Sequence, residues 1–312
     1  MPNTTVITSK IQAKSPKKQS PTGVHNKKND SGYLLEIQCR IATQTNHHKM
    51  ALCTKYAIRA EWNVPKVKGV NGKASVQGAV MCRSRLCPVC AVQRARKEEA
   101  QLEQVLTYHA ECGGTAHFCT FTKRTILDIE KSYKANREGI KAQNQYLRNQ
   151  KKQAGIVVSR YTIFEDTYSE EPVFVGSGEH AYEITTAHNH SHACYLFGKD
   201  VSKVNREKIL KGLVRVWSDT MKAHGTYTSQ KGIDVKLIDS SLFTHTKIAK
   251  YLSGIITPKT KIFKELSSSH TKLGTGRSLS ELMIDIDQHN RECDLKAYTD
   301  TVNTYKGKQR TF

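Results

Sequence analysis

The sequence predicts an α+β fold, in which helices pack on a mostly antiparallel central sheet and a helical, cysteine-bearing segment precedes that sheet. Two observations carry this prediction. Short segments rich in aromatic and β-branched residues alternate with long charged segments of helical periodicity. A cluster of cysteines lies ahead of the first predicted strand. At 312 residues the chain is long enough for one large domain or two modest ones.

The first part of the chain contains three predicted segments. Residues 1–30 are expected to form a flexible basic arm, because they contain six lysines against the single acid Asp30. Apolar residues recur at helical spacing from Tyr33 to about Ala60. The stretch 63–79 is rich in Gly, Val and Lys and predicts a loop. Residues 31–112, which also contain the cysteine cluster described next, are assigned to a helical, zinc-binding segment.

The cysteine cluster predicts a structural zinc site. Cys87-Pro88-Val89-Cys90 is a Cys-x-x-Cys pair, whose tight turn lets two thiolates reach one tetrahedral ion, and Cys82 is a third ligand. A closed thiolate site leaves no open position for catalysis. The fourth ligand is open at this point, with Cys53 as first choice and Cys39, His47 and His48 as alternatives.

Strands and helices then alternate. A charged helix is predicted over 91–108 and ends at Gly113-Gly114, a strand follows over 117–122, and a second charged helix is predicted over 126–153. A turn at Gly176-Ser177-Gly178 separates two of the short strands that come next, predicted over 156–164, 173–175, 180–186 and 190–197.

The last part of the chain adds a strand and several helices. An apolar stripe predicts a helix over 204–223, and alternation predicts a strand over 233–238. Helices are predicted over 241–255 and, more briefly, over 279–292. We therefore assign residues 113–257 to the domain that contains the sheet and 258–312 to a C-terminal extension.

The charge balance indicates a polyanionic partner. Lys and Arg number 49 against 28 Asp and Glu, a formal net charge of +21, and nucleic acid neutralises such an excess. The candidate DNA contacts are Arg83, Arg85 and Arg94, beside the cysteines, and Lys250. A membrane surface is the alternative, but no long apolar run or lipidation signal supports a membrane partner. The nine cysteines and the absence of a secretory signal predict a cytoplasmic location.

The run His188-Asn189-His190-Ser191-His192 predicts a second metal site. On a strand, His190 and His192 point to the same face, and His188 can join them if the strand begins early enough. Glu183, on the preceding segment, adds a carboxylate if the two segments form a hairpin. Such a site suits Mn²⁺ or Mg²⁺ as a Lewis acid for phosphoryl chemistry. The alternative is a polar strand edge with incidental histidines.

Tyr251 is the candidate nucleophile. One face of the predicted helix carries Ile248, Tyr251, Leu252 and Ile255, so this face must lie on the sheet. If it lies on the face that bears His190 and His192, it aims the phenol at the metal, and the cations Lys247 and Lys250 favour the phenolate. The alternative is that Tyr251 is an aromatic residue of the core.

The ordered set of motifs resembles the rolling-circle plasmid replication initiators, which are single-tyrosine members of the HUH endonuclease superfamily. The resemblance covers about 80–312. The segments that carry it are 82–90 (the cysteines), 118–122 (Phe-Cys-Thr-Phe-Thr), 188–192 (the histidines), 248–251 (Ile-Ala-Lys-Tyr) and the tail 305–310.

Two positions depart from the family pattern. Ser191 stands where a bulky apolar residue is usual, and Lys247 stands where a Glu often positions the water that ends the cycle, so another acid, such as Asp239, is needed there.

The resemblance implies an HUH or ferredoxin-like sheet and a DNA-nicking activity. A metal held by His190 and His192 polarises a phosphate of single-stranded or hairpin origin DNA, and Tyr251 attacks it, assisted by Lys250. The products are a 5′-phosphotyrosyl bond and a free 3′-OH, which host helicase and polymerase then use. A relaxase, a tyrosine-type transposase and a non-catalytic, zinc-stabilised nucleic-acid-binding regulator are the alternatives.

Overall fold

The computed structural model describes residues 31–54, 66–70, 73–77, 81–84, 86–228, 232–238 and 276–305. Several predictions fall outside these residues. They are the basic arm over 1–30, Arg85, Asp239, the helix over 241–255 with Lys250 and Tyr251, and most of the tail segment.

A four-stranded antiparallel sheet forms the centre of the fold, with the strand order β4-β7-β3-β8. Its strands are β3 (Thr115–Phe121), β4 (Val158–Tyr168), β7 (Ala187–Phe197) and β8 (Ile233–Ile238). The predicted α+β class and the strands predicted at these places are confirmed. The strand β7 lies between β4 and β3, and its side chains are largely buried because apolar residues pack on both faces of the sheet.

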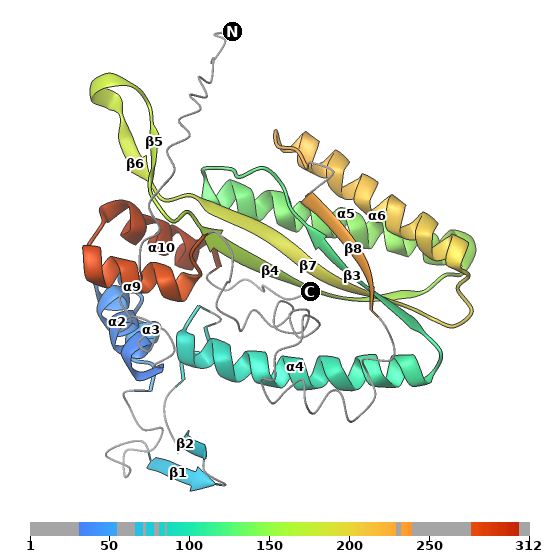
Figure 1. The fold of residues 1–312 in the computed structure, drawn as a ribbon, viewed down its shortest axis with the longest axis horizontal. Helices are drawn as coiled ribbons and strands as arrows, with labels where there is room; N and C mark the ends of the chain where they lie inside the picture. Colours follow the sequence, from blue (N-terminus) through green and yellow to red (C-terminus); the bar gives the residue numbers. More distant parts are fainter. Residues whose placement is uncertain are drawn as a thin grey trace, which may run out of the picture.

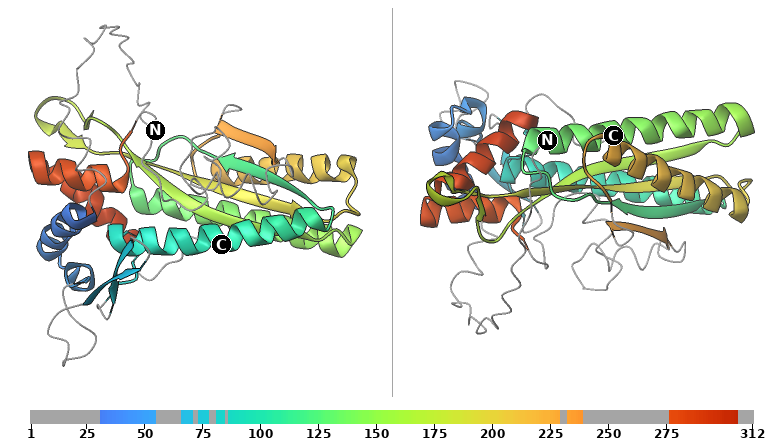
Figure 2. Two further views of the ribbon diagram at one scale, coloured as in Figure 1. Left: turned by 60° about the horizontal axis from the view of Figure 1, so that its bottom comes forward. Right: turned by 90° about the horizontal axis from the view of Figure 1, so that it is seen from above.

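Two helices, α5 (Ile129–Ala154) and α6 (Lys203–Ala223), lie side by side on one face of the sheet (Figures 1 and 2). Trp217 of α6 is fully buried against Phe121, with 5.3 Å between ring centroids. Gly139 of α5 has no room for a side chain, because a Cβ would lie 2.6 Å from the Trp217 ring. This glycine therefore lets the two helices approach each other closely.

The helix α4 (Pro88–Glu111) runs along the other face of the sheet (Figure 1). Its Leu102 and Leu106 pack in a smaller apolar cluster with Phe118, Cys194 and Leu196. The helix ends as predicted before Gly113, whose φ of 77° favours glycine. The side chains of β7 that face α4 are thus those with even numbers, which include His188, His190 and His192.

Four helices gather at one end of the sheet: α2 (Ser31–Gln44), α3 (His48–Ala51), α9 (Leu279–His289) and α10 (Glu292–Tyr305) (Figure 1). Buried Arg277 binds both carboxylate oxygens of buried Asp294, at 2.6 and 2.9 Å, and its backbone pairs with Tyr168 of β4. This bidentate pair fixes the start of the C-terminal helices to the sheet. The sequence predicted only the first of these two helices.

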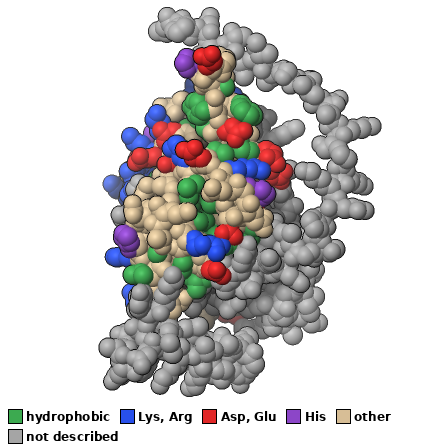
Figure 3. Space-filling model, turned by 90° about the vertical axis from the view of Figure 1, so that its left-hand side faces the viewer, with side chains coloured by type: hydrophobic (Ala, Val, Ile, Leu, Met, Phe, Trp, Pro, Cys, Tyr) green, Lys and Arg blue, Asp and Glu red, His purple; other side chains and the backbone are tan. Residues whose placement is uncertain are grey.

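Two small hairpins complete the described part. The predicted loop over 63–79 is wrong, because β1 (Lys66–Val70) and β2 (Lys73–Gln77) pair there in antiparallel register. The strands β5 (Val173–Val175) and β6 (Tyr182–Ile184) flank the predicted turn, where Gly176 has a φ of 99°, and the short helix η1 (Gly178–His180). Figure 3 views this end of the molecule, where acidic and basic side chains are interspersed.

A single apolar cluster joins the N-terminal helices, the sheet and the C-terminal helices. Ile37 of α2, Phe164 of β4 and Leu282 of α9 belong to it and are almost fully buried. The domain boundaries assigned from the sequence stay predictions. Within the described ranges, no helix combines the length and the apolar character needed to cross a membrane.

Candidate metal centres

The row of histidines lies on the central strand of the sheet. In β7, His190 and His192 are 7% and 4% exposed, and their ring centroids are 4.7 Å apart. Strand alternation puts both rings on the face that α4 covers farther along the strand. Burial on a strand held from both sides gives these imidazoles fixed positions.

The carboxylate beside the histidines comes from β4. Glu165 is the register partner of His190, and it is 8% exposed. Its Oε2 lies 3.0 Å from Nε2 of His190 and 2.8 Å from Nε2 of His192. Burial by itself raises the pKa of Glu165, but hydrogen bonds from His190 and His192 outweigh it and hold that pKa well below its usual range.

The neighbours of His192 fix the orientation of its ring. Its Nδ1 lies 3.1 Å from Oγ1 of Thr120 on β3, and the ring of Phe118 stacks on it at 5.5 Å with an interplanar angle of 14°. The bond at Nδ1 leaves Nε2 to face Glu165. This is the arrangement of a metal-binding histidine, whose second nitrogen is held by a neighbour.

The three side chains fit a divalent cation. Their ligand atoms all lie within 4.8 Å of one another, and the spacings to Glu165 are 2.8 and 3.0 Å. Ligands about 2.1 Å from one ion and at right angles to each other are themselves about 3 Å apart. Two imidazoles and one carboxylate leave further coordination positions for water or substrate oxygens.

Glu183, the carboxylate predicted from the sequence, is not part of this group. It lies on β6, opposite Phe174 of β5, and its side chain is exposed. The segment between Glu183 and His188 does not form a tight hairpin, so β7 pairs with β4 instead. His188 continues the row with its ring centroid 5.7 Å from that of His190, but its Nδ1 binds Oγ1 of Thr125 at 3.0 Å.

A buried polar network lies on the opposite face of the same strand. Asn189, fully buried, donates to Oδ1 of Asp166 at 2.6 Å, and Tyr305 of α10 donates to the same oxygen at 2.9 Å. The Lys123 ammonium donates to Ser132 at 2.7 Å and to both oxygens of Asn189. Burial lowers the pKa of Lys123 to about 8. This network links β4, α5 and α10 to Asn189, which lies between His188 and His190 in the sequence.

The structure brings the four first-choice cysteines together. Cys53, Cys87 and Cys90 are buried, Cys82 is half-buried, and all four sulfurs lie within 4.8 Å of one another. Cys87 caps the N-terminus of α4, where its Sγ accepts from the Cys90 amide at 3.5 Å. Hydrogen bonds from the other three thiols hold the pKa of Cys53 well below its usual range.

These thiols fit a tetrahedral zinc ion. Three of the sulfur pairs are 3.6 Å apart, far longer than a disulfide bond. Sulfurs bound to one zinc at about 2.3 Å in a tetrahedron are about 3.8 Å apart. Of the alternative ligands, Cys39 donates instead to the carbonyl of Ala51 at 3.1 Å. His47 and His48 are also outside the group.

Two of the predicted DNA-binding residues are described. Arg83 is exposed, with a left-handed φ of 56°, and Arg94 donates to its carbonyl at 3.2 Å. Both therefore lie beside the cysteines. Arg85, Lys250 and Tyr251 lie outside the described residues.

The sequence reasoning missed Glu165, Asn189 and Lys123. The local signal for Glu165 is that it shares one face of a strand with Ile163, but only the register with β7 identifies the carboxylate as the partner of His190.

Comparison with known proteins gives one match. A family model described as a replication protein matches residues 73–294, which include the cysteine pair, the histidine row and Tyr251. No match is found among curated proteins or among solved structures.

Proposed function

Because this chain belongs to the replication protein family, the rolling-circle plasmid initiators, we propose that it nicks one strand of its origin DNA in a metal-dependent transesterification by Tyr251. The observation that carries the proposal is the buried group of Glu165, His190 and His192. Origin DNA is the substrate, and host helicase and polymerase act on the product.

In this proposal the side chains of the sheet hold and orient the reacting phosphate. A divalent cation held by Glu165, His190 and His192 would supply Lewis-acid chemistry to a non-bridging phosphate oxygen. Thr120 and Phe118 keep the His192 ring in place. The fixed positions of these groups reduce the reorganisation that the reaction requires.

Tyr251 supplies the nucleophile. Its phenolic oxygen bonds to phosphorus, the bond from phosphorus to the 3′ oxygen breaks, and that oxygen leaves as a 3′-OH. The phenol proton passes to solvent, while the leaving oxygen takes up a proton. The neighbouring cations Lys247 and Lys250 favour the phenolate.

The cysteine group has a structural role in this proposal. Zinc bound by Cys53, Cys82, Cys87 and Cys90 would link α3 to the start of α4. It would also hold the segment of Arg83, Arg85 and Arg94, which contact DNA.

The test is a search for a covalent protein–DNA species. Single-stranded oligonucleotides tiled across both strands of the plasmid that carries the gene are incubated with the protein and Mn²⁺ and run on a denaturing gel. A 5′-phosphotyrosyl bond keeps a 3′ label on the protein and releases a 5′ label. Tyr251→Phe should abolish the species, whereas Tyr227→Phe, at an exposed tyrosine, should retain it.

Two outcomes would contradict the proposal. A covalent species that persists in Tyr251→Phe would exclude this nucleophile. If no oligonucleotide is cut with any divalent cation, the remaining function is that of a non-catalytic, zinc-stabilised DNA-binding regulator.

A further inference from the structure

The two helices on the sheet face away from the histidines form a strongly basic layer. The α5 helix has seven Lys and Arg against two Glu, and α6 has six against one Glu and one Asp. Most of the basic side chains are exposed, and only Lys131 and Lys141 have ion-pair partners among the described residues of these helices. The layer therefore presents a surface that favours a polyanion.

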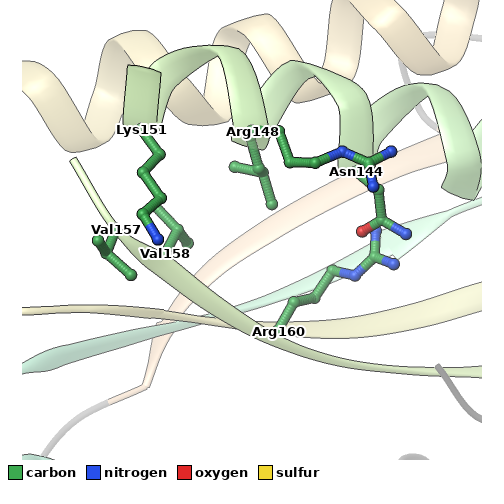
Figure 4. A pocket seen from close by; sticks show the side chains of 7 residues that line it. Asn144, Arg148, Lys151, Val157, Val158 and Arg160 are labelled. Atoms are coloured by element: carbon green, nitrogen blue, oxygen red, sulfur yellow. The ribbon is translucent and has the colours of Figure 1, made fainter. Parts of the chain in front are cut away.

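A pocket opens at the end of this layer, between α5 and the start of β4. Its volume is about 320 Å³. Figure 4 shows basic side chains from both elements around it, Arg148 and Lys151 from the helix and Arg160 from the strand, with Asn144 between them. None of the described residues that line it is acidic.

One basic side chain of the pocket, Arg160, has a buried hydrogen-bond donor without an acceptor among the described residues. This donor is the Nη1 nitrogen of the guanidinium. A buried guanidinium donor without an acceptor is costly, and an anion in the pocket would satisfy it. Lys151 lies in the last turn of α5, where a cation complements the helix dipole. Arg160 lies on a strand, so no helix dipole stabilises its positive charge.

The pocket is separate from the metal centre. Arg160 is the register partner of Tyr195, which donates to Gln143 of α5, whereas Glu165 is the register partner of His190. Positions 160 and 165 therefore point to opposite faces of the sheet. They are also about 17 Å apart along β4.

We propose that this pocket binds a phosphate of the DNA backbone, and that the basic layer of α5 and α6 carries duplex DNA on the face opposite the metal centre. Arg148 and Arg160 present guanidinium groups, which match phosphate oxygens bidentately, and Lys151 adds a point charge. The Asn144 amide donates a further hydrogen bond.

Duplex DNA fits better than an acidic protein segment. The charge of the layer extends along two helices, as a regular row of phosphates requires, and does not stop at the pocket. The chain also carries a formal charge of +21 and belongs to a family that acts on DNA.

The test compares two matched double variants of the full chain. Arg148→Gln/Lys151→Gln removes two charges from the pocket, and Lys49→Gln/Lys296→Gln removes two exposed charges outside α5 and α6, on α3 and α10. Binding to a short fluorescein-labelled duplex is followed by anisotropy between about 50 and 200 mM salt. The assay needs neither Tyr251 nor a metal, so its result is independent of the proposed nicking.

The pocket pair should weaken duplex binding about tenfold and reduce the slope of log K against log salt by up to about two, whereas the control pair should change affinity no more than about threefold. Equal losses in the two variants would mean that binding depends on net charge alone and not on this face of the protein, which would overturn the proposal. So would wild-type DNA binding by the pocket variant. Loss of binding to a polyglutamate peptide, with DNA binding unchanged, would assign the pocket to an acidic protein partner instead.

Discussion

Glu165 and His192 lie on neighbouring strands of the central sheet, and the carboxylate Oε2 of the first is 2.8 Å from Nε2 of the second. The two residues are far apart in the sequence, and each is less than 10% exposed. Strand pairing between β4 and β7 creates the group, because it places a carboxylate directly opposite His190.

Substitution of each carboxylate should show that nicking requires Glu165 and not Glu183, the carboxylate that the sequence favoured. Glu165→Gln keeps the size of the side chain but removes a charged ligand, so Mn²⁺-dependent nicking should fall about 100-fold or more. Glu183→Gln is the matched control and should nick like the wild type, because Glu183 is exposed on β6. Initial rates on a labelled single-stranded substrate measure both. Similar losses in the two variants would count against the assignment of Glu165.

The cysteine group should hold one zinc ion per chain. Cys87→Ser removes a ligand at the start of α4, and we expect it to lose the metal and to lower Tm by about 10 °C or more. Cys112→Ser, at an exposed cysteine outside the group, should keep both. Elemental analysis and thermal denaturation measure these quantities. Full zinc content in Cys87→Ser would show that the site does not use this thiol.

The network behind the histidines should contribute strongly to stability. Asn189→Leu leaves the buried groups of Lys123 and Asp166 without one of their partners, which should lower the free energy of unfolding by about 2–4 kcal/mol. Asn205→Leu, at an exposed position of α6, should change it by less than about 0.5 kcal/mol. Urea denaturation compares the two. A loss in Asn189→Leu no larger than in the control would mean that the network adds little.

Lys123 should make stability depend on pH above neutrality. Its pKa is about 8 in the folded protein against 10.5 when unperturbed, so the unfolded chain binds more protons between these values. Stability therefore rises with pH across this window, by up to about 3 kcal/mol, and the gain is lost progressively as the pH falls from 10.5 to about 8. Subtraction of the curve for Lys123→Met, measured by denaturation at several pH values, isolates this contribution. A flat difference curve would indicate an unperturbed lysine.

Local patterns predicted the elements of the sheet well and tertiary pairings poorly. The alternation in β7 placed His190 and His192 on one face, because side-chain direction along a strand is a local property. The partner carboxylate depends on which strand pairs with β7, and the sequence offered Glu183 because it lies on the segment just before β7, whereas β7 pairs with β4. Register between β4 and β7 is a property of the assembled core.

Two elements were missed for related reasons. The β1–β2 hairpin alternates Val with Lys and Ser around a turn, and its lysines suggested a loop. The α10 helix is polar on average, yet Tyr298 and Asp294 are fully buried in it. The buried Asp294 carboxylate is stabilised by Arg277 and by a hydrogen bond from Thr185, and no local sequence pattern predicts partners 17 and 109 positions away.

The decisive measurement is anomalous diffraction from crystals grown with Mn²⁺. We expect one strong manganese peak about 2.1–2.2 Å from Oε2 of Glu165 and from Nε2 of His190 and His192. The peak should vanish in crystals of Glu165→Gln and persist in those of Glu183→Gln. If wild-type crystals saturated with Mn²⁺ show direct hydrogen bonds from the two histidines to Glu165 and no peak among the three residues, these side chains do not form a metal site.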